Sequence, residues 1–298
     1  MNLDLYFPCD PDEKPLDRPV NDGGYCGIFR RIACIGDSLA SGEFESLDAE
    51  GKRAYHDYFD YSWGQYIARM AGCTVLNFSR GGMTAKVYCE SFASHCNYWD
   101  PDKRCQAYIA ALGVNDILNQ KWDTGSTADI CLSDWSKNEK TFSGYYGQII
   151  QRYREIEPYS RFFLVTPLRS SAAPAERQAL IGTLSESIRA LAGVFENTYV
   201  IDLNRYGPDA DAAFRAKFHL GGHMSPAGYM LVAKMMVSYI DWIIRHNAED
   251  FRQIGFVGTP YSYYGEKLPR NSMLKWAQAV PLSTRAMPIM TVRSVRLA

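Results

Sequence analysis

Five short runs of apolar residues alternate along the chain with longer stretches in which apolar residues recur at helical spacing. The short runs lie at residues 32–35, 74–78, 108–112, 162–165 and 199–203. Such uninterrupted apolar runs are typical of strands that are buried on both faces of a parallel sheet. The alternation predicts an α/β fold, a three-layer sandwich in which a five-stranded parallel sheet is flanked by helices.

Four of the longer stretches also carry the chemistry of helix ends. Ser62 and Ser225 are good N-caps, and Pro226 suits the first turn of the helix that follows Ser225. Gly72 suits a C-terminal cap, and Pro158 ends a helical pattern that begins near residue 142. The helices are expected at residues 62–72, 142–156, 174–194 and from 225 to about 246.

The remaining segments define the expected domain organisation. Residues 1–30 are rich in turn chemistry and are expected to form an N-terminal arm on the surface of one folded domain, residues 31–250. Residues 251–298 show no clear helix or strand and are expected to pack on that domain or on a partner subunit. Residues 121–139 are polar and are expected to be a surface loop with some local structure. Residues 43–60 are polar and contain several aromatic residues, and no helix or strand is assigned to them.

The composition narrows the possible partners. The chain has 298 residues with a formal net charge of −1, so it lacks the basic surface that nucleic acids or acidic membranes attract. We expect no membrane partner, because no apolar run is long enough to span a bilayer. We expect a cytoplasmic location, because the N-terminus does not resemble an export signal. The eight cysteines include no Cys-x-x-Cys pair, and we expect no bound metal or cofactor.

Three of the predicted strands end in polar or glycine-containing turns. Ser38 follows the first strand, two glycines end the turn at 77–82, and Asn115 lies in the turn at 113–116. The carboxyl ends of parallel strands meet at one edge of a sheet, where open α/β folds bind their ligands. Acyl transfer needs a hydroxyl nucleophile, donors for the developing oxyanion and a base, which His223 can supply.

These segments resemble a known family of enzymes. Gly-Asp-Ser-Leu at 36–39, Asn-x-Ser-x-Gly-Gly at 77–82, Gly-x-Asn-Asp at 113–116 and His-Met-Ser-Pro-Ala-Gly-Tyr at 223–229 resemble the four ordered blocks of the SGNH, or GDSL-type, hydrolases. The resemblance extends from residue 31 to about residue 246. It implies a flavodoxin-like fold, a catalytic domain at residues 31–250 and hydrolysis of esters through an acyl-serine intermediate.

The resemblance also implies a role for each matching residue. Ser38 would be the nucleophile, with its own backbone amide as one oxyanion donor. Gly82 would supply a second backbone donor, or Gly81 if the turn is shifted by one residue. Asn115 would supply a third donor through its side-chain amide, and His223 would be the general base.

One position departs from the family pattern. The family usually carries an aspartate three residues before its histidine, and here that position is Leu220. A leucine side chain cannot accept the hydrogen bond that selects the tautomer of the catalytic imidazole. We therefore expect a dyad of Ser38 and His223, oriented by a backbone carbonyl or by an aspartate from elsewhere in the chain. The candidate aspartates are Asp202, Asp209 and Asp211.

The expected substrate is a small-molecule ester with a small acyl group, and the leading class is a carbohydrate ester. A thioesterase or lysophospholipase of the same fold is an alternative. For either function, a homo-oligomer is left open as a partner state. Leu220 motivates a second class, a silenced hydrolase fold that only binds its ligand. A nucleotide-binding domain ranks last, because Gly-x-Gly-x-x-Gly does not follow the first strand. Glu43 and Arg80 lie near the expected mouth of the site and are interpreted as solvated charges.

Overall fold

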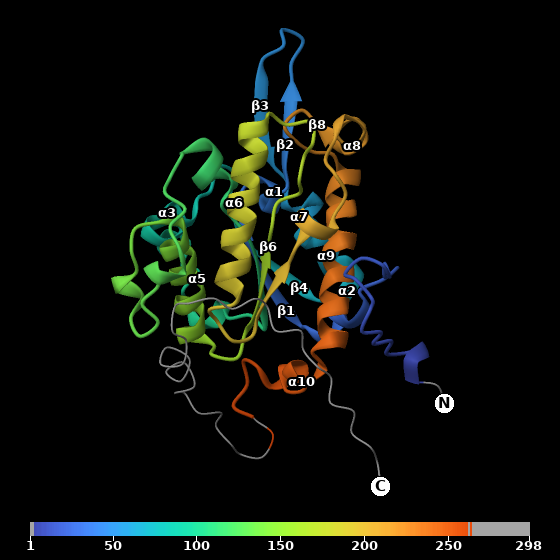
Figure 1. The fold of residues 1–298 in the computed structure, drawn as a ribbon, viewed down its shortest axis with the longest axis vertical. Helices are drawn as coiled ribbons and strands as arrows, with labels where there is room; N and C mark the ends of the chain where they lie inside the picture. Colours follow the sequence, from blue (N-terminus) through green and yellow to red (C-terminus); the bar gives the residue numbers. More distant parts are fainter. Residues whose placement is uncertain (1–2, 262, 264–298) are drawn as a thin grey trace.

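The computed structural model describes residues 3–261 and 263, and its central element is a five-stranded parallel sheet (Figure 1). The strand order is β4-β1-β5-β6-β7, and every neighbouring pair is parallel. The strands are β1 (Arg31–Gly36), β4 (Thr74–Ser79), β5 (Ala107–Ala111), β6 (Arg161–Val165) and β7 (Thr198–Ile201). The predicted fold class is confirmed, and the strands lie where the apolar runs placed them.

The sheet is buried on both faces, which explains the uninterrupted apolar runs. In β1, Ile32 and Cys34 belong to one hydrophobic cluster, whereas Phe78 of β4 and Ile35 belong to another on the opposite face. Successive side chains of a strand point to opposite faces. Each strand therefore contributes to two cores, and a polar side chain has no exposed face to occupy.

Helices α2 (Trp63–Ala71), α9 (Pro226–His246) and α10 (Ala248–Phe251) accompany the first core. Ser62 accepts a hydrogen bond from the Gln65 backbone N–H, and Ser225 accepts one from the Gly228 backbone N–H. Gly72 ends α2 with a φ of 65°, in the left-handed region that favours glycine. The three predicted caps are confirmed.

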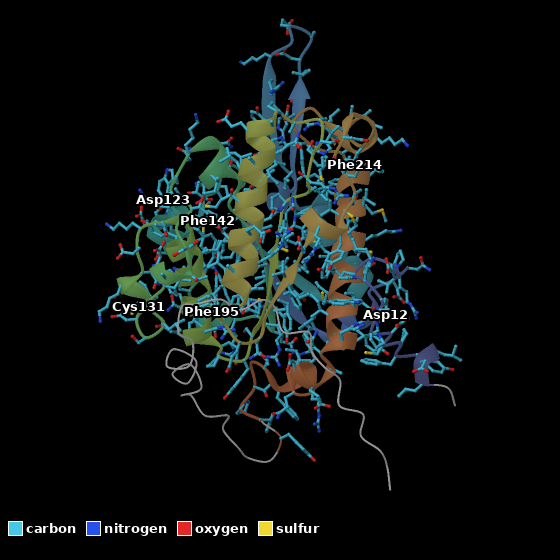
Figure 2. All side chains as sticks on the ribbon, viewed as in Figure 1. Asp12, Asp123, Cys131, Phe142, Phe195 and Phe214 are labelled. Atoms are coloured by element: carbon cyan, nitrogen blue, oxygen red, sulfur yellow. The ribbon has the colours of Figure 1, made fainter. Side chains whose placement is uncertain are left out.

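Helices α5 (Phe142–Ile156) and α6 (Ala175–Ala192) accompany the second core, together with α3 (Ala85–Val87) and α4 (Ala93–His95). Phe142 and Phe195 are among the side chains that fill this core (Figure 2). A π-helical turn at Tyr88–Phe92 joins α3 to α4. Because this turn changes the helical repeat, the segment shows little helical periodicity in its sequence.

Helix α9 is long and apolar enough to cross a membrane by length and composition alone. Within the structure, 67% of its most apolar window is buried, and its residues belong to the core beside the sheet. The expectation that no segment reaches this length was wrong. Helix α9 packs as a core helix. Core helices also meet these criteria of length and composition, so the criteria are weak evidence of a membrane span.

A two-stranded antiparallel hairpin, β2 (Glu43–Leu47) and β3 (Arg53–Asp57), rises from the top of the molecule in Figure 1. A second small pair, β8 (His219–Leu220) and β9 (His223–Met224), lies beside it. Three further short α-helices are α1 (Ser38–Ser41), α7 (Leu203–Tyr206) and α8 (Ala212–Phe218), and a π-helical turn spans Asn115–Asn119. The sequence pattern did not predict the hairpin, because every residue of β3 is exposed and the strand has no apolar run.

The two flanking segments pack on the first core. In the N-terminal arm, Glu13 binds the buried Arg245 of α9 at 2.7 and 2.8 Å, and Asp241 binds the same guanidinium at 2.8 Å. After α10, Ile254 and Val257 are buried in this core. Residues 264–298, most of the predicted C-terminal extension, lie outside the described residues.

Candidate active site

A pocket of about 540 Å³ lies at the carboxyl ends of the parallel strands. Ser38, Gly82, Asn115 and His223 all line this pocket. They come from four segments that are far apart in sequence, so the topology of the sheet brings them together. The pocket therefore holds a hydroxyl, a glycine backbone amide, a side-chain amide and an imidazole in one cavity.

Ser38 is placed by the turn at the end of β1. Asp37 is the N-cap of α1, and its carboxylate accepts a hydrogen bond from the Leu39 backbone N–H at 3.1 Å. Burial raises the pKa of Asp37 to about 6, against the hydrogen bond from Leu39. Within the described part of the chain, the Ser38 side chain makes no hydrogen bond, so its hydroxyl is free to react with a bound ligand.

The turn after β4 supplies the glycine. Gly82 has a φ of 69°, and its backbone N–H has no hydrogen-bond partner among the described residues. Gly81, the alternative donor, does not line the pocket. A Cβ on Gly81 would lie 2.1 Å from Oε2 of Glu43, so glycine at this position makes room for the Glu43 carboxylate.

The side chain of Asn115 is held in a defined orientation. Its Oδ1 accepts a hydrogen bond from Asn119 at 2.6 Å, and its Nδ2 donates to the Met83 carbonyl at 3.1 Å. The same nitrogen makes a long contact of 3.4 Å with Oδ2 of Asp37. A contact of this length is weak, so one N–H of the amide can turn to a ligand in the pocket.

His223 lies between two carboxylates of the same strand. Its Nδ1 is 2.9 Å from Oε1 of Glu45, and its Nε2 is 3.0 Å from Oε1 of Glu43. The two glutamates lie two residues apart on β2, so their side chains leave the strand on the same face. A neutral imidazole carries one N–H and can donate to one carboxylate only. With both contacts formed, either the ring carries two protons or Glu43 carries one.

The two glutamates differ in their surroundings. Oε1 of Glu45 also accepts the Gly222 backbone N–H at 2.6 Å, and Oε2 lies 3.1 Å from Nε of Arg53. Burial alone would raise the pKa of Glu45, but the hydrogen bonds from His223 and Gly222 and the charge of Arg53 hold it below its usual value. Burial raises the pKa of Glu43, although the nearby His223 opposes the shift.

None of the aspartates proposed from sequence contacts His223. Asp202 binds Arg189 at 2.7 and 3.0 Å and Thr166 at 3.0 Å, Asp209 accepts the Ser171 backbone N–H, and Asp211 caps α8. Nδ1 of His223 contacts a glutamate rather than a backbone carbonyl. The expectation of a backbone carbonyl or an aspartate beside Nδ1 was therefore wrong. The interpretation of Glu43 as a solvated charge was also wrong, because its carboxylate contacts the ring.

Leu220 occupies the position of the missing aspartate and is 54% exposed. The residue that contacts Nδ1 instead, Glu45, lies in a polar segment to which no helix or strand was assigned from sequence. One signal in the sequence pointed to it: Glu43 and Glu45 alternate with apolar Phe44, as on one face of a strand. That pattern gives no indication of which distant residue the carboxylates contact.

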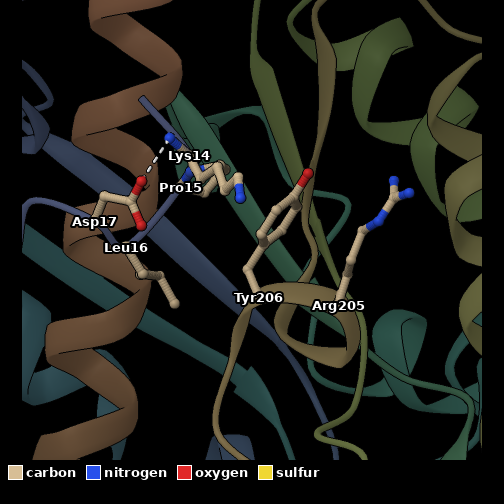
Figure 3. A pocket seen from close by; sticks show the side chains of 6 residues that line it. All are labelled: Lys14, Pro15, Leu16, Asp17, Arg205 and Tyr206. Atoms are coloured by element: carbon tan, nitrogen blue, oxygen red, sulfur yellow. Dashed lines mark hydrogen bonds between the residues drawn. The ribbon is translucent and has the colours of Figure 1, made fainter. Parts of the chain in front are cut away.

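A second hollow of about 590 Å³ lies between the N-terminal arm and α7 (Figure 3). Its lining residues are Lys14, Pro15, Leu16, Asp17, Arg205 and Tyr206. The Lys14 backbone N–H donates to the Asp17 carboxylate at 3.0 Å and so fixes the arm locally. Of the residues that line it, none is a serine, cysteine or histidine, so the candidate site is the pocket at the sheet edge.

The fold and the pocket together define a class, that of three-layer α/β proteins with a serine in a pocket at the end of the first strand. A family model for the GDSL-like lipase/acylhydrolase family matches residues 34–231, and the chain belongs to this family. It is thus an enzyme of the kind that hydrolyses ester bonds. A comparison with curated proteins gives no match.

Several solved structures are similar to this chain. A family two carbohydrate esterase from Clostridium thermocellum in complex with cellohexaose has 14% identity and a TM-score of 0.50, over 78% of this chain and 66% of that one. The M. smegmatis aryl esterase has 16% identity and a TM-score of 0.49, over 71% and 98%. A carbohydrate acetylesterase from Sinorhizobium meliloti has 15% identity and a TM-score of 0.46, over 72% and 99%. At these identities the comparison concerns the fold alone.

Proposed function

We propose that the protein is a serine esterase that hydrolyses a small-acyl carbohydrate ester through an acyl-enzyme intermediate. The observation that carries the proposal is the convergence of Ser38, Gly82, Asn115 and His223 on one pocket in a chain of this family. These are the four groups that acyl transfer requires: a nucleophile, two of the oxyanion donors and a base.

In the first step, Oγ of Ser38 attacks the carbonyl carbon of the ester and transfers its proton to Nε2 of His223. The carbonyl oxygen becomes an oxyanion, which accepts hydrogen bonds from the backbone N–H groups of Ser38 and Gly82 and from Nδ2 of Asn115. His223 then gives the proton to the alcohol oxygen as the C–O bond breaks. Water attacks the acyl-serine, again with His223 as base, and the carboxylic acid and free Ser38 are formed.

This sequence requires a movement of Glu43. Its carboxylate lies 3.0 Å from Nε2 of His223, the nitrogen that must receive the Ser38 proton. Among the described residues, the Glu43 carboxylate is hydrogen-bonded or ion-paired only to this ring. We infer that the side chain of Glu43 leaves Nε2 when substrate binds, because nothing else in the described structure anchors it there.

Charge and shape indicate which esters the pocket accepts. Arg177 and Arg215 line other parts of the pocket, but Asp37 directly precedes Ser38 and Glu43 contacts His223, so their carboxyl groups disfavour an anionic acyl group next to the serine. Tyr55, which lines the pocket and is 53% exposed, offers an aromatic face to the alcohol portion. Aromatic faces bind the apolar faces of sugar rings, and one similar structure is that of a carbohydrate esterase. These points support a neutral acyl group on a sugar.

The test is hydrolysis of p-nitrophenyl acetate and of an acetylated oligosaccharide by the wild type and by Ser38→Ala. We expect the variant to lose at least about a thousandfold in kcat, because the nucleophile is removed while binding groups remain. p-Nitrophenyl octanoate should react more slowly than the acetate in the wild type. Equal, background rates for the wild type and Ser38→Ala would contradict the proposal and favour a silenced fold that only binds.

A further inference from the structure

We propose that Glu45 is the positioning residue of His223 and replaces the aspartate that the family carries at the position of Leu220. The inference rests on the proposed function, in which His223 is the base. It assigns the acid of the catalytic triad to the β2–β3 hairpin, which lies between the first and second sequence blocks rather than beside the histidine.

The geometry meets the requirements of that role. Oε1 of Glu45 lies 2.9 Å from Nδ1 of His223, the ring nitrogen that does not face the serine in the proposed mechanism. A carboxylate only accepts hydrogen bonds, so this contact fixes the proton on Nδ1 and leaves the Nε2 lone pair for Ser38. Its negative charge also stabilises the imidazolium that forms when His223 takes the proton. A leucine, or a neutral backbone carbonyl, cannot supply that charge.

The structure distinguishes Glu45 from Glu43, although both contact the ring. Glu45 is held by two further groups, the Gly222 backbone N–H at 2.6 Å and Nε of Arg53 at 3.1 Å, and its side chain is 6% exposed. The Glu43 carboxylate has neither contact. A positioning residue must itself be fixed by its surroundings. Glu45 is fixed, whereas Glu43 is free to leave.

The loop that carries the histidine is shaped to receive Glu45. A Cβ on Gly221 would lie 2.3 Å from Oε2 of Glu45, and a Cβ on Gly222 would lie 2.5 Å from Oε1. Any larger residue at these positions would displace the carboxylate. The Gly222 backbone N–H and the ring of His223 bind the same carboxylate oxygen. The glycine pair and the glutamate therefore form one structural unit.

The test compares Glu45→Gln and Glu45→Ala with two controls on the hairpin. Glu45→Gln keeps the shape and removes the charge, and we expect kcat to fall about a hundredfold to ten-thousandfold with little change in KM. Ser46→Ala and Leu47→Ala alter exposed residues of the same strand and leave the contacts of Glu45 in place. Both controls should retain kcat within a few-fold. Added formate should restore part of the activity of Glu45→Ala, because it can occupy the space of the lost carboxylate.

A spectroscopic measurement separates this inference from the proposed function. A ring N–H that donates to a carboxylate gives a proton resonance far downfield of the amide region. The measurement is made in a Glu43→Gln background, which removes the carboxylate beside Nε2. There we expect the resonance with and without Ser38→Ala, and its loss when Glu45→Ala or His223→Ala is added. Persistence of the resonance in Glu45→Ala, or a folded Glu45→Gln with unchanged kcat, would overturn the assignment. A Glu45-dependent resonance in a protein without Ser38-dependent hydrolysis would instead overturn the proposed function and leave the contact established.

Discussion

Asp116 is a buried acid whose removal should make the protein more stable at alkaline pH. Its side chain is fully buried, and one carboxylate oxygen accepts the Ala85 backbone N–H at 2.9 Å. The other oxygen, Oδ2, has no hydrogen-bond partner in the described structure. Burial raises the pKa of Asp116 from 3.8 to about 7. The substitution Asp116→Asn keeps the size of the side chain and the acceptor for Ala85 but removes the charge.

The size of the effect follows from the shift in pKa. A shift of about 3 units corresponds to about 4 kcal/mol. The pKa of Asp116 is raised in the folded state, so the protonated carboxyl group favours folding. This contribution of Asp116 to the unfolding free energy is fully present below pH 3.8, the pKa in the unfolded chain, and is lost as the pH rises through about 7. Between about pH 5 and about pH 8, linkage predicts a loss of roughly 2.5 kcal/mol through this group. Asp116→Asn should not show this loss.

The assay is urea unfolding of the wild type and Asp116→Asn at those two pH values, with the exposed Asp60→Asn as a matched control. The difference in unfolding free energy between Asp116→Asn and the wild type should shift in favour of the variant by roughly 2.5 kcal/mol at the higher pH. For Asp60→Asn the difference should stay constant. If the difference for Asp116→Asn is the same at both pH values, Asp116 does not titrate with a raised pKa and the reasoning is wrong.

Three further substitutions test the packing of the fold and the correction made to the site. Gly64→Ala places a Cβ 2.6 Å from Sγ of Cys34 and should destabilise the protein by about 1–3 kcal/mol in thermal unfolding. Gly182→Ala, in α6 with no atom within 4 Å of the new Cβ, should be neutral or stabilising, and equal effects of the two would contradict the packing argument. Asp202→Ala should lower the melting temperature, because it leaves the Arg189 guanidinium without its main partner, yet keep kcat for p-nitrophenyl acetate near that of the wild type. A loss of kcat without a fall in melting temperature would instead indicate that Asp202 acts in the active site.

The sheet and the main helices were predictable because their signals are local. The run at 32–35 is apolar because both of its faces are covered, and Ser62, Gly72 and Ser225 act within their own helix ends. The segment at 85–95 was missed because a π-helical turn interrupts the helical repeat that the sequence analysis relied on. Local sequence patterns therefore predicted the strands and helices wherever the spacing of apolar residues is regular.

The partner of His223 was not predictable from local patterns. Glu45 and His223 meet through the approach of β2 to β9, which joins segments nearly the whole domain apart in sequence. The exposed strand β3 gave no indication of a hairpin. The family pattern has an aspartate beside its histidine, so only aspartates were considered as the acid that contacts His223. The glycine pair at 221–222 belongs to the same contact. Its physical reason, the space that Glu45 requires, is visible only once the two segments are placed together.

The hairpin has a consequence for how the protein responds to heat. A two-stranded ribbon is only marginally stable by itself, and β3 buries none of its residues. If the carboxylate that orients the imidazole of His223 lies on this hairpin, local unfolding of the hairpin stops catalysis while the sheet and its helices remain folded. Warming would then abolish catalysis before it abolishes the circular dichroism of the backbone, and the active enzyme and the folded enzyme would have separate melting points.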